Sequence, residues 1–259
     1  MASNFHTNDN DDNDNNGTQG GGGGGGETIM TEGGIMFQQN MSEFVQVDRK
    51  VFFAAADRNK DVILEQLKPI LDKAQSVLEI GSGSGQHIYR FSKDYPNVTF
   101  QPTEYGSCLL PSIDAYADDL IKEGHHIKPA LELDATNPEH WQNVREATGQ
   151  PQQSSFDLVV TTNVFHISPW IVSQSIVRGA GQVLKSGGYL VVYGPFKRGG
   201  EFNTESNREF DKTLRGRDPS WGVRDIEEIE TVAKNEADMT LEKVMEMPAN
   251  NYMLFFQKK

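Results

Sequence analysis

Hydrophobic and polar positions alternate along most of the chain in a repeating pattern of strand, turn and helix. Between Asp57 and Leu71 the apolar residues fall at helical spacing, which predicts one amphipathic helix. A short apolar run, Ser76–Ile80, then predicts a strand. It ends in a glycine-rich turn, and the residues from Gln86 to Lys93 are predicted to form a helix. Strand, tight turn and helix in this order are typical of an α/β protein.

The same alternation continues through the middle of the chain. The pattern predicts four further strands, at Val98–Thr103, Ile127–Leu133, Phe156–Thr161 and Tyr189–Tyr193. It predicts helices between them, at Asp114–Glu123, Pro138–Ala147 and Val172–Leu184. The last helix is expected to end in a C-cap and turn at Lys185-Ser186-Gly187-Gly188.

The C-terminal part departs from this alternation. A polar, charged segment from Lys197 to Asp225 precedes a predicted helix, Ile226–Asn235. Two β-like runs follow, Thr240–Met247 and Tyr252–Gln257, and the Pro248–Asn251 stretch between them is typical of a hairpin turn. The predicted fold is therefore a doubly wound, Rossmann-like α/β sheet that is mostly parallel and has a C-terminal antiparallel hairpin.

Composition separates residues 1–40 from the rest of the chain. Asn8–Asn16 contains only Asn and Asp, and Gly20–Gly26 contains only Gly. Such a stretch has almost nothing apolar to bury against the entropy of ordering it, so a disordered tail is expected here. Residues 41–259 are then expected to form a single domain.

Much of the net charge of −13 comes from residues 1–40. Residues 1–40 contain six acidic residues and no Lys or Arg, which leaves 31 acids and 24 bases, or −7, for the remainder. That balance argues against broad electrostatic binding to nucleic acid or to an anionic membrane.

The cysteine content and the hydropathy of the chain indicate in which cellular compartment the protein is expected. Cys108 is the single cysteine, so neither an internal disulfide nor a Cys-rich metal site can form, and we expect no metal. The N-terminus lacks the pattern of a signal peptide, and no apolar run approaches the length of a membrane span. We expect a cytoplasmic protein, leave a nuclear location open, and leave the oligomeric state open.

The turn Gly81-Ser82-Gly83-Ser84-Gly85 is the strongest indication of a ligand. A glycine turn after the first strand brings backbone N–H groups and a helix N-terminus close to a ligand. Dinucleotide turns carry glycines at the first, third and sixth positions, but here the sixth position is Gln86. Together with Glu79, the turn instead resembles the first motif of class I methyltransferases, which implies S-adenosylmethionine as the cofactor.

Two later strand ends offer polar partners for an adenosine group. Glu104 follows the second strand and could accept hydrogen bonds from two ribose hydroxyls, or it could be a solvated strand end. Asp134 follows the third strand; by the same resemblance it would contact the adenine amino group, with Ala135 small enough to let the base lie flat. Asp134 could equally be a helix N-cap.

The fourth strand leads into Asn163 and His166, where the reacting centre of a doubly wound enzyme would lie. His166 could act as a base, bind the substrate by a hydrogen bond, or be structural. Further on, Arg215, Arg217 and Trp221 could form a lid over a small polar acceptor, or they could belong to a loop held by internal Arg–Asp pairs.

Several stretches together resemble the methyltransferase-like twenty-six family, a group with a class I fold and no established substrate. These stretches are Asp57-Arg58-Asn59-Lys60, Glu79–Gln86, Thr103-Glu104, Asn207–Trp221 and Met247-Pro248-Ala249-Asn250-Asn251. The resemblance implies a seven-stranded class I sheet that binds S-adenosylmethionine, with Arg58 and Asn59 reaching over its methionine end. The other cofactor contacts that we expect are Glu79, Gly81, Ser82, Gly83, Gly85, His87, Glu104, Asp134, Ala135 and Asn163.

The predicted function is S-adenosylmethionine-dependent methyl transfer to a small or peptide-like acceptor, which yields S-adenosylhomocysteine. His166 is the candidate base if the acceptor atom carries a proton. The alternative is a catalytically silent module on the same fold that binds the cofactor or a protein partner. An NAD-dependent oxidoreductase is disfavoured by Gln86 and by the lack of a Tyr-x-x-x-Lys pair.

Overall fold

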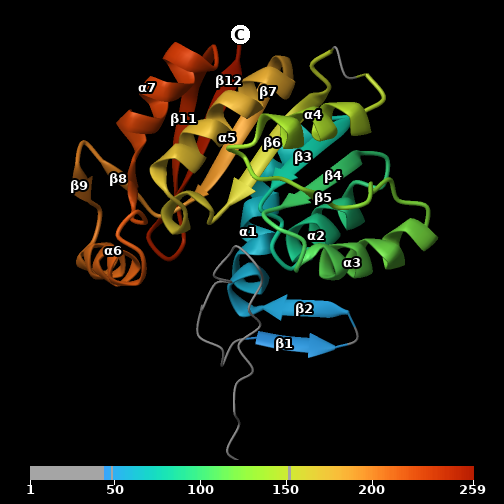
Figure 1. Ribbon diagram of the computed structural model, residues 1–259, viewed down its shortest axis with the longest axis horizontal. Helices are drawn as coiled ribbons and strands as arrows, with labels where there is room; N and C mark the ends of the chain where they lie inside the picture. The colour runs from blue at the N-terminus through green and yellow to red at the C-terminus, as the bar shows by residue number, and fades with distance from the viewer. Residues whose placement is uncertain (1–43, 48, 151–152) are drawn as a thin grey trace, which may run out of the picture. The chain divides into compact units, whose positions relative to one another are not determined.

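The computed structural model of the protein describes residues 44–47, 49–150 and 153–259. The expected disordered tail, residues 1–40, lies outside the described residues. All elements given below belong to the part of the chain that follows it (Figure 1).

A seven-stranded sheet forms the centre of the fold. Its strands are β3 (Ser76–Ile80), β4 (Thr99–Glu104), β5 (Leu131–Glu132), β6 (Phe156–Thr162), β7 (Leu184–Gly194), β11 (Met239–Met247) and β12 (Asn251–Lys258). They lie in the order β11-β12-β7-β6-β3-β4-β5, and the five strands from β7 to β5 are parallel. Strand β12 pairs antiparallel with both β7 and β11. The predicted fold class is confirmed.

Helices cover both faces of this sheet because its central strands are apolar on both sides. One buried cluster joins the sheet to three helices, α4 (Pro138–Ala147), α5 (Trp170–Val183) and α7 (Ile226–Glu236). A second cluster joins the opposite face to α1 (Ala54–Leu71), α2 (Gln86–Asp94) and α3 (Leu110–Lys122). The two clusters alternate along β6, where Leu158 and Val160 pack on the second side and Val159 on the first.

Two smaller sheets flank the central one. Strands β1 (Phe44–Val47) and β2 (Lys50–Phe53) form an antiparallel hairpin ahead of α1. Strands β8 (Phe196–Arg198), β9 (Glu201–Phe202) and β10 (Arg224–Asp225) form a three-stranded sheet. Helix α6 (Glu205–Arg217) lies between β9 and β10 in the chain. The polar segment after the fifth strand is therefore largely regular structure.

The predicted C-cap and turn after α5 is wrong, although the helix ends within one residue of the predicted position. The helix ends at Val183, and β7 begins at Leu184 without a glycine cap. Leu184 pairs with Phe156 and Tyr189 with Leu158, so the four residues between Leu184 and Tyr189 bulge out of the ladder. Burial of Leu184 in the core outweighs the glycine pair as a stop signal.

Other boundaries differ by several residues. Helix α1 begins at Ala54 because β2 leads directly into it, and α3 begins at Leu110. The third parallel strand is reduced to Leu131–Glu132, with one isolated bridge between Ile127 and Phe100. The carboxyl ends of all five parallel strands meet at one edge of the sheet, and this edge carries the predicted site.

Candidate functional site

The glycine turn joins β3 to α2 in a conformation that few other residues adopt. Gly81, Gly83 and Gly85 have φ angles of +72°, +57° and +97°. A Cβ on Gly81 would lie 2.5 Å from Val164 Cγ2, and one on Gly85 would lie 2.8 Å from Ile113 Cα. At Gly83 the nearest atom, in the Phe53 ring, is 3.6 Å away. Gly81 and Gly85 therefore permit tight packing, whereas Gly83 has room beside it.

The N-terminal hairpin is fastened to this turn by buried hydrogen bonds. The backbone N–H of Phe53 donates to Gln86 Oε1 at 2.6 Å, and Ser84 Oγ donates to the same oxygen at 2.8 Å. The backbone N–H of Val51 donates to Ser112 Oγ, which donates to the Ser84 carbonyl. Gln86, which distinguishes this turn from a dinucleotide turn, thus holds the hairpin against it.

Four buried polar side chains around the turn have no hydrogen-bond partner among the described residues. Both carboxylate oxygens of Glu79 are unpartnered, as are Ser82 Oγ, Thr161 Oγ1 and Thr162 Oγ1. They lie at the ends of the neighbouring strands β3 and β6 and in the turn itself. Burial raises the pKa of Glu79 to about 8. Because unpartnered buried polar atoms are costly, this group is suited to a polar ligand.

His87 and Asn59 lie beside Glu79. His87 Nε2 is 2.8 Å from Asn59 Oδ1, and His87 Nδ1 is 4.0 Å from Glu79 Oε1. Burial lowers the pKa of His87 to about 4, so its ring is neutral at pH 7. The amide of Asn59 also contacts the Tyr193 hydroxyl, whose pKa is raised by burial. The buried face of α1 thus joins the turn to the end of β7.

Glu104 lies under the turn at the end of β4. Its Oε2 accepts a hydrogen bond from the Gly83 N–H at 2.5 Å, and its Oε1 accepts one from the Tyr105 N–H at 2.9 Å. Burial raises the pKa of this carboxyl to about 7, and the two N–H groups oppose the rise. Glu104 is therefore hydrogen-bonded directly to the glycine turn.

Asp134 and Ala135 follow β5 at the same edge. Asp134 Oδ1 accepts hydrogen bonds from the backbone and side chain of Thr136, at 2.8 and 2.7 Å. The N-cap of α4 is Asn137, whose side chain accepts from the Glu139 N–H, so the alternative role for Asp134 as that cap is wrong. Ala135 is buried.

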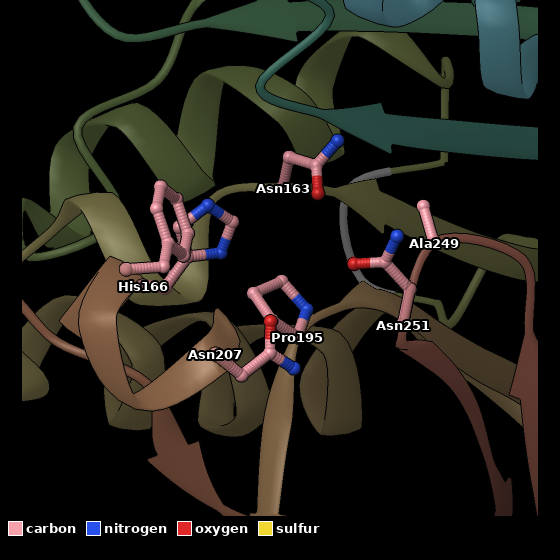
Figure 2. A pocket seen from close by; sticks show the side chains of 7 residues that line it. Asn163, His166, Pro195, Asn207, Ala249 and Asn251 are labelled. Carbon is pink, nitrogen blue, oxygen red and sulfur yellow. The ribbon is translucent and has the colours of Figure 1, made fainter. Parts of the chain in front are cut away.

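A cavity of about 250 Å³ lies beyond β6 and β7 at this edge (Figure 2). Its walls come from the loops after these two strands, from α6 and from the turn between β11 and β12. The lining residues are Asn163, His166, Pro195, Asn207, Phe210, Ala249 and Asn251. Phe165, His166 and Ile167 form a short 3₁₀ turn, and Asn163 has a left-handed φ of 60°.

His166 is 4% exposed, and its ring makes an edge contact with Phe210 at a centroid distance of 5.5 Å. Burial and the positive charge of Arg224 lower the pKa of His166 to about 3. Its imidazole is therefore neutral at pH 7 and can accept a hydrogen bond, but it is a weak base.

The three residues expected in a lid do not line the cavity. Arg215 pairs with Asp211 at 2.8 Å, and Arg217 is exposed. Trp221 is half-buried, and its backbone N–H donates to the Asp218 carbonyl. The same polar segment does supply two lining residues, Asn207 and Phe210.

Sequence reasoning did not select Asn207, Phe210, Ala249 or Asn251 as site residues, although all four lie in stretches that carry the family resemblance. Arg58, also in such a stretch, is exposed on α1. Among the described helices none is long and apolar enough to span a membrane. Within the same residues no group of three or more His, Cys, Asp or Glu side chains is placed to hold a metal ion.

A family model described as protein of unknown function (DUF938) matches residues 50–258. The chain belongs to the DUF938 family. The match covers the whole central sheet, α1, and both regions of the site.

Several solved structures are similar to this DUF938 chain at low sequence identity. An O-methyltransferase family protein from Burkholderia thailandensis is 14% identical, with a TM-score of 0.58. The match covers 79% of this chain and 60% of the solved chain. The pyocyanin biosynthetic protein PhzM is 14% identical with a TM-score of 0.60, covering 79% and 56%. Human N-acetylserotonin methyltransferase, solved with S-adenosylmethionine, is 13% identical with a TM-score of 0.57, covering 79% and 52%.

These similarities show the class I methyltransferase fold. The DUF938 chain spans about half to three fifths of the length of these solved chains.

Proposed function

We propose that this DUF938 protein binds S-adenosylmethionine at the glycine turn and transfers its methyl group to a small acceptor in the cavity beside His166. The observation that carries this proposal is the adjacency of the two places. Gly81 packs directly against Val164, and Val164 follows Asn163 in the wall of the cavity. The turn and the cavity therefore meet across β3 and β6, as a donor site and an acceptor site must.

The residues around the turn fit the cofactor by their chemistry. Glu79 offers a buried carboxyl group to the α-ammonium group of the methionine moiety, and Ser82, which lies beside Glu79, offers its hydroxyl. Glu104 would accept from the ribose hydroxyls, with Asp134 and Ala135 beside the adenine. The remaining contacts that we propose are Arg58, Asn59, Gly81, Gly83, Gly85, His87 and the backbone of Asn163, whose side chain faces the cavity.

The cofactor supplies an electrophilic methyl group on a sulfonium, so the protein's own task is to orient the acceptor and to exclude water. His166 suits the first part of that task. Its neutral ring can accept a hydrogen bond from the acceptor, whereas its low pKa makes it a poor general base at pH 7.

The DUF938 match and the resemblance to the methyltransferase-like twenty-six family involve the same residues. All the stretches that resemble the methyltransferase-like twenty-six family fall within residues 50–258 or form part of the site. We infer that the two family descriptions refer to one group. The names of similar solved proteins, an O-methyltransferase and N-acetylserotonin methyltransferase, support methyl transfer to a small molecule rather than to nucleic acid.

Calorimetry with S-adenosylhomocysteine tests the cofactor site, with Gly83→Asn as the informative variant. Asn tolerates the left-handed backbone of Gly83, and its side chain would occupy the space beside the turn. The matched control is Gly199→Asn, since Gly199 has a φ of +58° and a Cβ added there would have no atom within 4 Å.

Wild type and Gly199→Asn should bind S-adenosylhomocysteine, and Gly83→Asn should bind at least tenfold more weakly. Binding of NAD in place of S-adenosylhomocysteine would refute the cofactor assignment. Transfer of label from S-adenosylmethionine to components of a small-molecule extract, lost in Gly83→Asn, would then separate an enzyme from a catalytically silent module. Binding without any transfer would favour the silent module.

A further inference from the structure

The hydrogen-bonding direction of Asn207 in the cavity wall is fixed by its neighbours. Its Nδ2 donates to Asn203 Oδ1 at 2.8 Å and to the Asn250 carbonyl at 2.9 Å. A backbone carbonyl can only accept, so the nitrogen must face it, and both amide hydrogens are used. The remaining polar atom of this buried side chain, Oδ1, can only accept.

The hydrogen bonds of Asn251, at the start of β12, fix the orientation of its amide in the same way. Its Nδ2 donates to the Tyr193 hydroxyl at 3.0 Å and to the Pro248 carbonyl at 3.1 Å. Figure 2 shows the side-chain oxygens of Asn163, Asn207 and Asn251 turned toward the space that these residues enclose. Three carbonyl oxygens from three separate parts of the chain thus converge on one small cavity.

The cavity wall carries no ionised side chain. Its polar lining consists of three amides and His166, which is neutral at pH 7, and the rest is Pro195, Phe210 and Ala249. Carbonyl oxygens repel an anion. The buried guanidinium of Arg224 is already bonded to the carbonyls of Phe165, Ser168 and Ser220, and its positive charge acts on His166. That charge disfavours a cation in the same place.

We propose that the acceptor is a compact, neutral molecule that presents at least two hydroxyl groups to the side-chain oxygens of Asn163, Asn207 and Asn251. This inference rests on the proposed function, because it assigns the cavity to the methyl acceptor. The cavity of about 250 Å³ lies below the roughly 300–1,000 Å³ usual for drug-sized ligands, so the part of the acceptor that lies inside it is about the size of one small ring. Phe210 and Pro195 supply apolar faces for that ring.

Four ring probes of similar size test the inference on the full chain with saturating S-adenosylhomocysteine, by ligand-observed NMR at pH 7. Resorcinol is neutral and has two hydroxyl donors, and 1,3-difluorobenzene has nearly its size and shape without donors. Benzoate is an anion, and benzylammonium is a cation. Resorcinol should bind at least tenfold more tightly than the other three. Equal binding of difluorobenzene, benzoate or benzylammonium, or no binding of resorcinol, overturns the proposal.

Substitutions of Asn163 test whether the ring probes bind in the cavity. Asn163→Asp adds a negative charge at an almost unchanged shape, and it should raise benzylammonium binding at least tenfold. Asn163→Gly keeps the left-handed backbone and removes the oxygen, so it should weaken resorcinol binding. Asn235→Asp, an equal change of charge at an exposed position on α7, should alter neither. If neither Asn163 variant changes probe binding, the cavity is not the binding place.

The affinity for S-adenosylhomocysteine is measured on every variant, so the two proposals can fail separately. If S-adenosylhomocysteine binds and resorcinol shows no preference, the acceptor class is wrong and the cofactor assignment stands. If resorcinol binds through Asn163 and S-adenosylhomocysteine does not bind, the proposed methyl transfer fails while the ligand chemistry of the cavity stands.

Discussion

At the scale of single residues, Glu79 links the structure of the turn to a measurable pH dependence. Its pKa of about 8 makes it neutral at pH 7, whereas the proposed contact with an α-ammonium group favours the carboxylate. Binding should therefore release a proton. For one such carboxyl, the dissociation constant falls by about tenfold per pH unit as the pH rises toward its pKa, and then levels off.

Calorimetry of S-adenosylhomocysteine binding between pH 6 and 8, in buffers of different ionisation enthalpy, measures this release. Glu104, with a pKa of about 7, titrates in the same range, whereas His87, at about 4, does not. Glu79→Gln should therefore remove the pH dependence above pH 7 and leave a weaker one below it. A wild-type affinity that is constant from pH 6 to 8 would contradict the contact.

His166 gives a second prediction at this scale. Because its pKa is about 3, its ring does not change charge between pH 5 and 8. The rate of methyl transfer should show no inflection from His166 in that range, and His166→Ala should raise KM for the acceptor more than it lowers kcat. The pH profiles of kcat and kcat/KM for both proteins check this. An inflection near pH 6.5 that disappears in the variant would identify His166 as a base instead.

The sequence located the residues that local motifs specify. The glycine turn and the acidic residues at or just after the ends of β4 and β5 are predictable because each lies where a predicted strand ends. The bond from the Gly83 N–H to Glu104, and the meeting of Asn207 with Asn251, were not predictable. They depend on side chains that are far apart in the chain and come together only through the packing of α6 and the β11–β12 turn.

At the scale of elements, α6 shows why a polar segment can conceal a helix. Its buried residues, Asn207, Asp211 and Leu214, lie at helical spacing, but two of the three are polar. Hydrophobic periodicity therefore gave no helical signal. The helix is stabilised instead by specific polar contacts: Asp211 accepts from the Val223 N–H at 2.7 Å and pairs with Arg215.

Removal of that carboxylate should loosen the acceptor side of the site. Asp211→Ala leaves the buried Val223 N–H without a partner, at a cost of about 1–3 kcal/mol in the free energy of unfolding. Resorcinol binding should weaken, while the affinity for S-adenosylhomocysteine stays within about twofold because Asp211 bonds to Val223 and Arg215 rather than to the glycine turn. Urea denaturation and hydrogen exchange of α6 measure the effect.

Glu209→Ala is the control on the same helix. Glu209 is exposed and pairs with Lys212 one turn away, so its loss should leave the free energy of unfolding almost unchanged. A similar loss in both variants would mean that the bond from Val223 has no special role.

At the scale of the whole molecule, the fold was predictable because every unit of the central sheet has a clear local signal. Strand patterns and glycine turns agree along the chain, and β5 and the bulge in β7 depart most from the expected strands. The fold also collects an unusual set of buried titratable groups along one sheet edge. Their combined effect is a property of the molecule rather than of any one residue.

The last prediction concerns stability against pH in the absence of ligand. The pKa values of Glu79 and Glu104 rise from 4.5 to about 8 and about 7, so the folded state holds protons that the unfolded chain has released, and stability falls as pH rises through this range. The pKa values of His87 and His166 fall from 6.5 to about 4 and about 3, so their contribution rises with pH up to about 6.5.

The two pairs oppose each other between about pH 4.5 and 6.5, where stability should be nearly flat. Of these four groups, Glu79 and Glu104 alone still differ in protonation between the folded and unfolded states above pH 6.5. The free energy of unfolding should therefore decline toward pH 8, by an amount on the order of a few kcal/mol. Urea denaturation from pH 5 to 8 measures the profile. Glu79→Gln should flatten the decline, and S-adenosylhomocysteine should oppose it increasingly as pH rises, because the bound state favours the ionised carboxyls. A stability that increases between pH 6.5 and 8 without ligand would show that these carboxyls are not held protonated by burial.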